Sequence, residues 1–325
     1  MAKPLDYSPF TTHYSLFAIR YSLFAIRYSP VRYSLRRGSR VQIVDSQVHI
    51  WAENTPERPW APNMEGRAHL PEPLTAQRLV GMMDEAGVDA AILVPPSLEG
   101  DRNDLALAAT RTYPGRFAVM GRIDFSKPQA RAALATWREQ PGMLGARLTF
   151  HRPDTRGELT DGSADWLWDA AEKHGIPLMV HAPERLPVLG EIAQRHPGLT
   201  LIVDHMGFGR DTMDDRAPAG AARVAALARH PNVFVKVSAL PCFTSEPYPF
   251  RNLNEPVRRV IEAFGPRRCF WGTDLSRMLE HCSYRQGVTH FTEELDFLSA
   301  DDLDWIMGRG LRECLRWNLP AKVPH

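Results

Sequence analysis

The stretch Val41-Gln-Ile-Val-Asp-Ser-Gln-Val-His-Ile-Trp51 opens the regularly patterned part of the chain. Apolar and polar residues alternate along it, which is typical of a β-strand. Successive side chains of a strand point to opposite faces. One face of this strand is therefore expected to carry the side chains of Ile43, Asp45, Gln47 and His49. A buried strand has no structural use for an amide and an imidazole side by side at its end. The pattern therefore predicts a functional site at the carboxyl end of this strand.

The same pattern of strand followed by helix repeats along the rest of the chain. Strands are expected at residues 41–51, 89–96, 117–124, 144–150, 178–181, 199–207, 233–238 and 269–274. Helices are expected at residues 74–87, 103–113, 130–139, 164–174, 185–196, 219–229, 255–264, 287–298 and 301–317. Eight strands that alternate with helices predict one α/β domain, a (β/α)8 TIM barrel, over residues 41–320. A doubly wound open sheet is the rival, but the first strand is not followed by the glycine-rich phosphate turn usual in that fold.

Residues 1–40 differ from the rest in composition. Tyr14-Ser-Leu-Phe-Ala-Ile-Arg20 is repeated at once as residues 21–27. Seven basic residues and one acid give this segment a net charge of +6, which leaves −5 for residues 41–325. A short, exact, basic repeat predicts a disordered extension or a mis-assigned start codon, and an organellar address signal is the alternative. We therefore treat this segment as separate from the barrel.

Composition argues against several classes of partner and location. The mildly acidic body does not favour a nucleic-acid partner, and no apolar run is long enough to span a membrane. The four cysteines show no Cys-x-x-Cys pair and no disulfide pattern, which favours a reducing, cytoplasmic location. The long loops at 51–73, 208–220 and 241–254 are expected to set substrate choice as a lid, or to form contacts in a homo-oligomer.

Polar residues stand where most of the predicted strands end. In a barrel of this kind functional side chains gather at the carboxyl ends of the strands. Taken singly, a histidine there is often only hydrogen-bonded, Asp274 could cap a helix, and Arg147 could form an internal ion pair. Their joint occurrence at one mouth predicts a catalytic pocket. Its expected members are Gln47, His49, Arg122, Asp124, Arg147, Thr149, His181, His205, Lys236, Ser238 and Asp274.

Five motifs together carry a resemblance to a known family. They are Asp45-Ser-Gln-Val-His-Ile-Trp51, Leu178-Met-Val-His181, Val203-Asp-His-Met-Gly207, Val235-Lys-Val-Ser238 and Trp271-Gly-Thr-Asp274. In this order they resemble the second amidohydrolase family, which holds lactonases, other hydrolases and non-oxidative decarboxylases of small acids. The resemblance covers residues 41–318 and implies an amidohydrolase-type barrel. It assigns the strand-5 and strand-6 histidines to His181 and His205, and the expected proton acceptor to Asp274.

One departure from that family concerns a metal ion. The family usually has His-x-His on the first strand, or Glu-x-His in many decarboxylases, whereas this chain has Gln47-Val-His49. A neutral amide is a poor ligand for a borderline divalent ion. His49, His181 and Asp274 remain as a two-histidine, one-carboxylate set that could hold one zinc or manganese ion weakly. A site without a metal is the equal alternative.

Together with the residues, the resemblance implies hydrolysis of a carbonyl ester, with a lactone of a small organic acid as the expected substrate. Asp274 is expected to activate water as general base. His181 and His205, or a metal ion held by His49 and His181, are expected to stabilise the oxyanion at the carbonyl oxygen. An amide N–H and two arginines are suited to bind the substrate and its carboxylate. The residues expected to contact substrate are Gln47, His49, Trp51, Arg122 and Arg147.

Two other functions remain open at this point. A non-oxidative decarboxylase of an aromatic acid would usually carry an acidic metal ligand on the first strand, and Gln47 argues against it. A catalytically inactive barrel that serves as a binding protein is the second alternative. The joint presence of His49, His181, His205 and Asp274 argues against inactivity, because nothing structural requires all four.

Overall fold

The structure is a computed structural model that describes residues 41–151, 155 and 157–319. The basic repeat at residues 1–40, and with it the expectation of a separate extension, lies outside the described residues. Within the described part, no helix has both the length and the apolar character needed to cross a lipid bilayer. All four cysteines carry free thiols.

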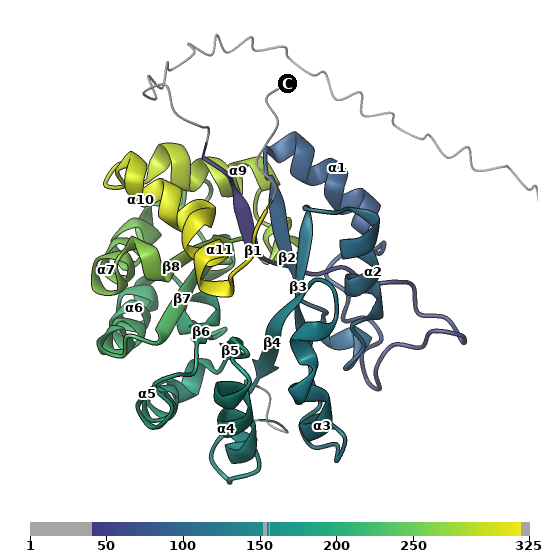
Figure 1. The fold of residues 1–325 in the computed structure, drawn as a ribbon. Helices are drawn as coiled ribbons and strands as arrows, with labels where there is room; N and C mark the ends of the chain where they lie inside the picture. Colours follow the sequence, from purple (N-terminus) through teal and green to yellow (C-terminus); the bar gives the residue numbers. More distant parts are fainter. Residues whose placement is uncertain (1–40, 152–154, 156, 320–325) are drawn as a thin grey trace, which may run out of the picture. The chain divides into compact units, whose positions relative to one another are not determined.

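Eight parallel strands in the described residues form one sheet, in which each strand pairs with the next along the chain. They are β1 (Val44–Val48), β2 (Ala90–Leu93), β3 (Phe117–Arg122), β4 (Met143–Thr149), β5 (Leu178–His181), β6 (Leu201–Val203), β7 (Val233–Ser238) and β8 (Cys269–Gly272). The last strand returns to the first, where the backbone N–H of Asp274 donates to the carbonyl oxygen of Gln47 at 3.1 Å. The ring of strands is thus nearly closed (Figure 1). The predicted (β/α)8 barrel is confirmed.

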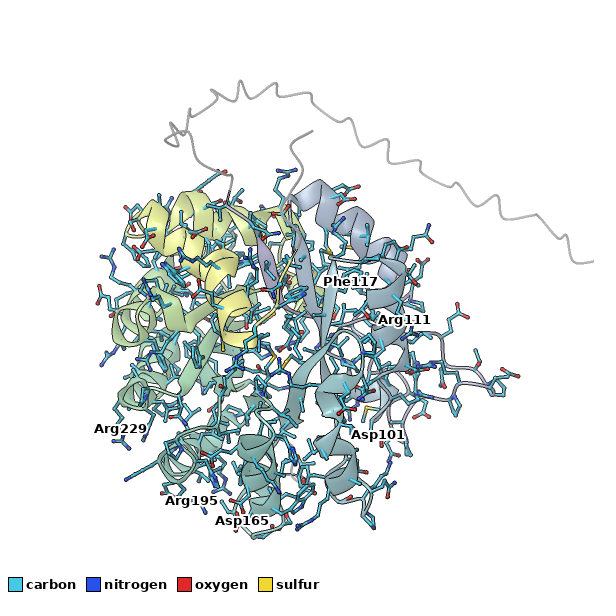
Figure 2. The ribbon with its side chains drawn as sticks, viewed as in Figure 1. Asp101, Arg111, Phe117, Asp165, Arg195 and Arg229 are labelled. Atoms are coloured by element: carbon cyan, nitrogen blue, oxygen red, sulfur yellow. The ribbon has the colours of Figure 1, made fainter. Side chains whose placement is uncertain are left out.

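Helices surround this ring of strands (Figure 1). They are α1 (Ala76–Ala86), α2 (Asp104–Thr112), α3 (Ala130–Ala135), α4 (Asp165–Lys173), α5 (Leu186–Arg195), α6 (Ala217–Ala225), α7 (Asn254–Phe264), α8 (Leu275–Met278), α9 (Tyr284–Thr289), α10 (Ala300–Asp304) and α11 (Gly310–Leu315). Helix α1 begins where the Thr75 hydroxyl accepts from the backbone N–H of Arg78 and ends at Gly87, whose φ of 81° suits glycine. Charged residues such as Arg111 and Arg195 stand on the solvent side of their helices (Figure 2). The helices are therefore amphipathic, as their sequence spacing predicts.

The apolar core has two layers. One cluster fills the inside of the barrel and draws from strands all round the ring, with Val44, Ile92 and Phe270 among its members. The larger cluster lies between the outer faces of the strands and the helices, and includes Leu79 and Met83 of α1. The larger cluster also reaches the loops after the strands, where Trp51, Leu98 and Phe208 line a central cavity. Close packing of the two clusters therefore supports the carboxyl ends of the strands.

The expected side-chain alternation along the first strand is wrong at one point. Ile43 packs in the outer cluster, and Asp45 accepts a hydrogen bond from Tyr284 of the outer helix α9, yet Gln47 and His49 face the central cavity. The pairing of β1 with β2 shifts register between Asp45 and Val48. An extra residue at such a bulge reverses which face the following side chains occupy. The bulge therefore lets Asp45 serve the outer layer while Gln47 and His49 serve the cavity.

Several predicted elements are shorter than expected, and three of them end or break at an unusual backbone conformation. The strand expected at 199–207 ends at Val203, because His205 and Met206 adopt left-handed backbone angles. The helix expected at 287–298 becomes a π-helical turn at His290–Glu294. The helix expected at 301–317 is interrupted by a π-helical turn at Trp305–Arg309. There a Cβ on Gly308 would lie 2.4 Å from the carbonyl oxygen of Gln42, so only glycine permits this close approach to the strand-1 segment.

Candidate active site

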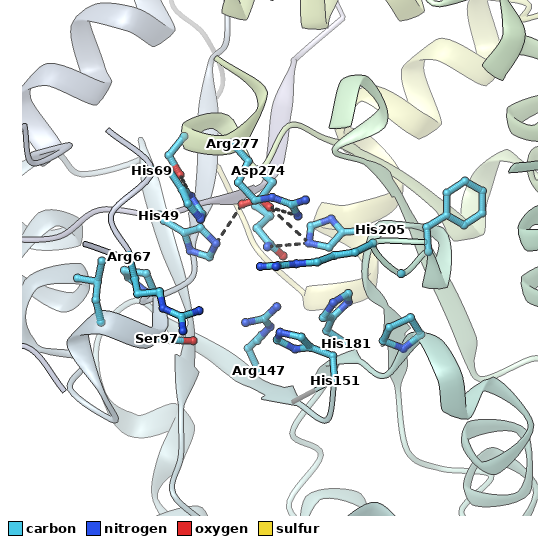
Figure 3. Close-up of a pocket in the computed structure, with 18 of the residues that line it drawn as sticks. His49, Arg67, His69, Ser97, Arg147, His151, His181, His205, Asp274 and Arg277 are labelled. Atoms are coloured by element: carbon cyan, nitrogen blue, oxygen red, sulfur yellow. Dashed lines mark hydrogen bonds and ion pairs between the residues drawn. The ribbon is translucent and has the colours of Figure 1, made fainter. Parts of the chain in front are cut away.

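A cavity of about 480 Å³ lies at the carboxyl ends of the strands. Figure 3 shows His49, Asp274 and Arg277 on one side of it, and Arg147, His151 and His181 on the other. Of the predicted site residues, those that line the cavity are Gln47, His49, Trp51, Arg147, His181, His205 and Asp274. Segments far apart in the sequence thus meet at one place, as the barrel predicts.

Arg122, which was expected to bind the substrate carboxylate, does not line this cavity. It is the last residue of β3, and its backbone N–H donates to the side-chain oxygen of Asn103 at 2.8 Å. The amide of Asn103 in turn donates to the carbonyl oxygen of Arg122 at 2.9 Å. The end of β3 is therefore tied to the start of α2, away from the cavity wall.

Asp274 is held at the floor of the cavity in a strained backbone conformation. Its φ of 52° and ψ of 50° are in the left-handed region, which costs a non-glycine residue about 1–3 kcal/mol. One carboxylate oxygen lies 3.0 Å from His49 Nε2, and the other lies 3.2 Å from a terminal nitrogen of Arg277. Burial disfavours the charged carboxylate, but the neighbouring His49 and Arg277 outweigh it and hold the pKa of Asp274 well below its usual value. Asp274 is therefore ionised at neutral pH.

Asp45 fixes the position of Asp274 from behind. Its Oδ1 accepts the backbone N–H groups of Gln47 and Thr273, each at 3.0 Å. Its Oδ2 accepts the hydroxyl groups of Thr273 at 2.5 Å and Tyr284 at 2.9 Å. This fully buried carboxylate thus joins β1, the end of β8 and α9. Its partner Thr273 directly precedes Asp274 in the sequence. Its four hydrogen bonds make Asp45 a structural support of the site.

A chain of buried polar groups runs beneath the cavity. Lys236 Nζ donates to Gln47 Oε1 at 2.7 Å and also lies 2.8 Å from Asp204. Gln47 Nε2 lies 3.2 Å from His205 Nε2, and His205 Nδ1 lies 2.9 Å from the Ser238 hydroxyl. Burial lowers the pKa of His205 to about 4, so this imidazole is neutral at pH 7.

Arg147 and His181 occupy the far side of the cavity. Arg147 forms an ion pair through Nε with Asp204 at 3.1 Å, the internal pairing considered from sequence, and it also lines the cavity. The His181 ring lies edge-on to His205 at 5.4 Å and 4.9 Å from the His151 ring. Burial lowers the pKa of His181 well below its usual value, and the neighbouring His205 and Arg147 lower it further. His181 is therefore a neutral imidazole.

A divalent metal ion does not fit these side chains as they stand. Among the described residues, no three His, Cys, Asp or Glu side chains form a group that could hold an ion. His49 and Asp274 of the expected set meet, but His181 packs against the other histidines instead. Gln47 Oε1 already accepts from the buried ammonium of Lys236, which would repel a divalent cation placed beside it.

Several lining residues have only a weak signal in the sequence or none. His151 follows Arg147 and Thr149 at intervals of two beyond β4, so strand alternation carried past Phe150 would have indicated it. Arg67 and His69 come from the long loop after β1, where no periodicity applies; His69 Nδ1 contacts the Ser276 hydroxyl at 2.9 Å. Arg210 comes from the loop after β6. Their positions depend on loop conformation, which local patterns do not specify.

The comparisons with known proteins agree with this architecture. An L-fucono-1,5-lactonase from Burkholderia ambifaria is 27% identical over 252 residues, which are 73% of this chain and 82% of that protein. A 2-pyrone-4,6-dicarboxylate hydrolase from Comamonas testosteroni is 25% identical over 244 residues, 71% of this chain and 75% of that protein. The crystal structure of an amidohydrolase from Burkholderia multivorans with bound zinc has a TM-score of 0.72 at 23% identity. That likeness covers 86% of this chain and all of that chain, and it supports the fold.

The family described as Amidohydrolase matches residues 44–309, which is most of the chain and all eight strands. The match spans the motifs at the strand ends from Gln47 to Asp274. With the closed barrel and the cavity at its carboxyl end, this shows that the chain belongs to the amidohydrolase family.

Proposed function

We propose that this protein is a lactonase that hydrolyses a small lactone bearing a carboxylate. The observation that carries the proposal is the ionised, buried carboxylate of Asp274 on the floor of a cavity rich in arginine and histidine. Two relatives named for the hydrolysis of cyclic esters support the reaction class. Because the donor set does not suit a metal ion, the proposed steps use the protein's own side chains.

Asp274 acts as the general base. A water molecule beside its carboxylate gives up a proton to it while the water oxygen attacks the lactone carbonyl carbon. The carbonyl π electrons move onto oxygen and form a tetrahedral oxyanion. Collapse of this intermediate breaks the bond to the ring oxygen, which takes the proton back from Asp274. The product is the open hydroxy acid, and Asp274 returns to its ionised state.

The oxyanion needs donors on the far side of the cavity from Asp274. His181 Nδ1 is buried and has no hydrogen-bond partner among the described residues, so the favoured tautomer carries its proton on Nε2. That N–H and the terminal nitrogens of Arg147 are the donors we assign to the oxyanion. His205, expected from the sequence to share this role, accepts a hydrogen bond at Nε2 and is assigned no donation to substrate.

The charges around the cavity favour an anionic substrate. Arg67 and Arg210 line the mouth, and neither has an ion-pair partner among the residues the structure describes. Arg147 and Arg277 add two further cations, whereas Asp211 and Asp274 are the only acids that line the cavity in the described part. Guanidinium groups bind carboxylates in a planar, two-point arrangement. A lactone that carries a carboxylate away from its ester bond therefore suits this mouth.

A substrate panel tests the proposal. It should contain neutral aldono-1,5-lactones, lactones that carry one or two carboxylates, aryl esters and aromatic acids. Acid release is followed with a pH indicator, and carbon dioxide release is followed separately. We expect the carboxylated lactones to give the highest kcat/KM. Carbon dioxide release from an aromatic acid without lactone opening would favour a decarboxylase, and binding without any turnover would favour the inactive barrel.

A further inference from the structure

Lys236 of β7 is a charged side chain buried in the barrel, with a side-chain exposure of 0%. A lysine is almost never buried in this way unless its ammonium has partners. Its Nζ has two, Gln47 Oε1 at 2.7 Å and Asp204 Oδ1 at 2.8 Å. Burial lowers the pKa of Lys236, and the Asp204 carboxylate opposes that effect. The ammonium therefore sits between one carboxylate and one amide.

The ammonium determines how the Gln47 amide is turned. An ammonium group only donates hydrogen bonds, so the atom of Gln47 that faces Lys236 is the carbonyl oxygen. The NH₂ group then points the opposite way, where His205 Nε2 lies at 3.2 Å. The orientation of the amide, which is usually ambiguous, is fixed here by its partners.

The amide in turn determines which nitrogen of His205 carries the proton. Because Gln47 donates toward Nε2, a proton on that nitrogen would face another N–H, so Nε2 must accept. The proton is then on Nδ1, which donates to the Ser238 hydroxyl at 2.9 Å. Both nitrogens of the ring are engaged. The residue also has a strained backbone, with φ of 52° and ψ of 43°, which is consistent with a conformation held by its surroundings.

We propose that Lys236 is a positioning residue of this site, which acts through Gln47 to hold His205 as the neutral tautomer with its proton on Nδ1. The inference rests on the proposed hydrolysis for its kinetic consequence only. His205 Nε2 lies 3.7 Å from Asp274 Oδ2. A proton on Nε2 would be directed at that carboxylate and would weaken it as a base. The chain from Lys236 to Ser238 keeps this proton away from Asp274.

The tautomer can be read directly by NMR, without a substrate. Protein labelled with ¹⁵N-histidine gives two-bond ¹H–¹⁵N correlations whose pattern distinguishes the two neutral tautomers and the imidazolium. The chain has 12 histidines, so the His205 signals are identified by their loss in His205→Gln. At pH 7.5 we expect the wild-type pattern of a neutral ring protonated on Nδ1. The other neutral tautomer, or an imidazolium, would overturn the proposal.

Two variants and one control test the role of Lys236 and Gln47. Gln47→Glu keeps an acceptor toward Lys236 but replaces the N–H donor by an oxygen, so His205 should move its proton to Nε2 or become cationic. Lys236→Met removes the ammonium, so the freed amide should leave His205 as a mixture of tautomers. Lys127→Met removes an exposed lysine that pairs with Asp101, and it should leave the His205 signals unchanged. If Lys236→Met does not fold, Gln47→Glu decides the question.

The kinetic readout separates this inference from the proposed function. Once a substrate is known, Gln47→Glu should lower kcat by at least about 10-fold, because a proton on His205 Nε2 weakens the base. His205 signals that are identical in wild type, Gln47→Glu and Lys236→Met would refute the positioning role, whatever the substrate. Failure to find any hydrolysed lactone would refute the proposed function and leave the tautomer result standing.

Discussion

His49 Nε2 lies 3.0 Å from Asp274 Oδ1, while the other nitrogen of the same ring, Nδ1, lies 2.6 Å from the carbonyl oxygen of Val94. A carbonyl oxygen only accepts, so Nδ1 carries a proton. The Nε2 atom on the opposite side of the ring faces the Asp274 carboxylate. The His49 ring therefore bridges the end of β2, at Val94, and the proposed base.

The pair predicts that His49 and Asp274 act as one unit. His49→Gln removes the ring that bridges Val94 and the carboxylate, and we expect turnover to fall on the order of 10- to 100-fold because Asp274 is no longer held in place. In the double variant with Asp274→Asn, turnover should be no lower than in Asp274→Asn alone, because His49 acts through the missing carboxylate. Steady-state kinetics of the four proteins check this. Losses that multiply in the double variant would show that His49 has an independent role.

Removal of the base itself should be the most severe change. Asp274→Asn keeps the shape of the side chain but cannot accept the proton of water, so kcat should fall by about 10²- to 10⁴-fold. Thermal unfolding of the variant checks that the fold survives. Asp211→Asn changes an exposed acid at the mouth of the same cavity and serves as the control, with expected turnover close to that of the wild type. Wild-type turnover in Asp274→Asn would remove the general base from the mechanism.

The donor set predicts how the enzyme responds to chelation. Gln47 offers its oxygen to Lys236 and not to the cavity, so a divalent ion lacks a third protein ligand among the described residues. Protein treated with a chelator and shown by elemental analysis to be free of zinc and manganese should keep its full activity. Loss of activity that returns only when one of these ions is added back would contradict the expectation and restore the metal to the site.

The barrel could be predicted from the sequence because each strand and helix has its own local periodicity, and eight such units have few ways to pack. The bulge in β1 could not, because it depends on how Asp45 bonds to Thr273 and Tyr284, more than 200 residues away. The turn at Gly308 could not be predicted either, because it depends on the carbonyl oxygen of Gln42, which is distant in the sequence but close in space.

The site was predictable to the extent that its residues are on strands. His49, His181 and Asp274 follow from the rule that function gathers at strand ends. Arg122 obeys the same rule in sequence but does not line the cavity, and its backbone is bonded to Asn103 at the start of α2. The pairing of Lys236 with Gln47 joins β7 to β1, and only the closed ring makes these residues neighbours.

A comparison of Arg147 with Arg122 tests substrate binding, because only Arg147 lines the cavity. Arg147→Lys replaces a planar guanidinium that lines the cavity by a compact ammonium, and we expect KM for a carboxylated lactone to rise about 10-fold or more. KM for a neutral lactone of similar size should change much less. Arg122→Lys, outside the cavity lining, should leave both values unchanged. An equal effect of Arg147→Lys on both lactones would place the substrate carboxylate elsewhere.

His290 should make the fold less stable in mild acid. Its ring packs between Phe250 and Phe291, and its Nε2 has no hydrogen-bond partner among the described residues. Burial lowers the pKa of His290 from 6.5 to about 4. Between these values the unfolded chain binds a proton that the folded protein does not, so the free energy of unfolding falls as the pH decreases. Across the whole interval this residue accounts for a loss on the order of 3 kcal/mol.

Substitution of His290 measures how much of the pH dependence of the free energy of unfolding comes from this residue. In urea unfolding at pH 7 and pH 5, His290→Phe should lose less stability on acidification than the wild type, because phenylalanine cannot take up a proton in the unfolded chain. Part of the decrease should remain, since burial also lowers the pKa values of His181 and His205. His174→Gln alters an exposed histidine and should follow the wild type. If His290→Phe follows the wild type as well, the buried imidazole is not a source of acid sensitivity.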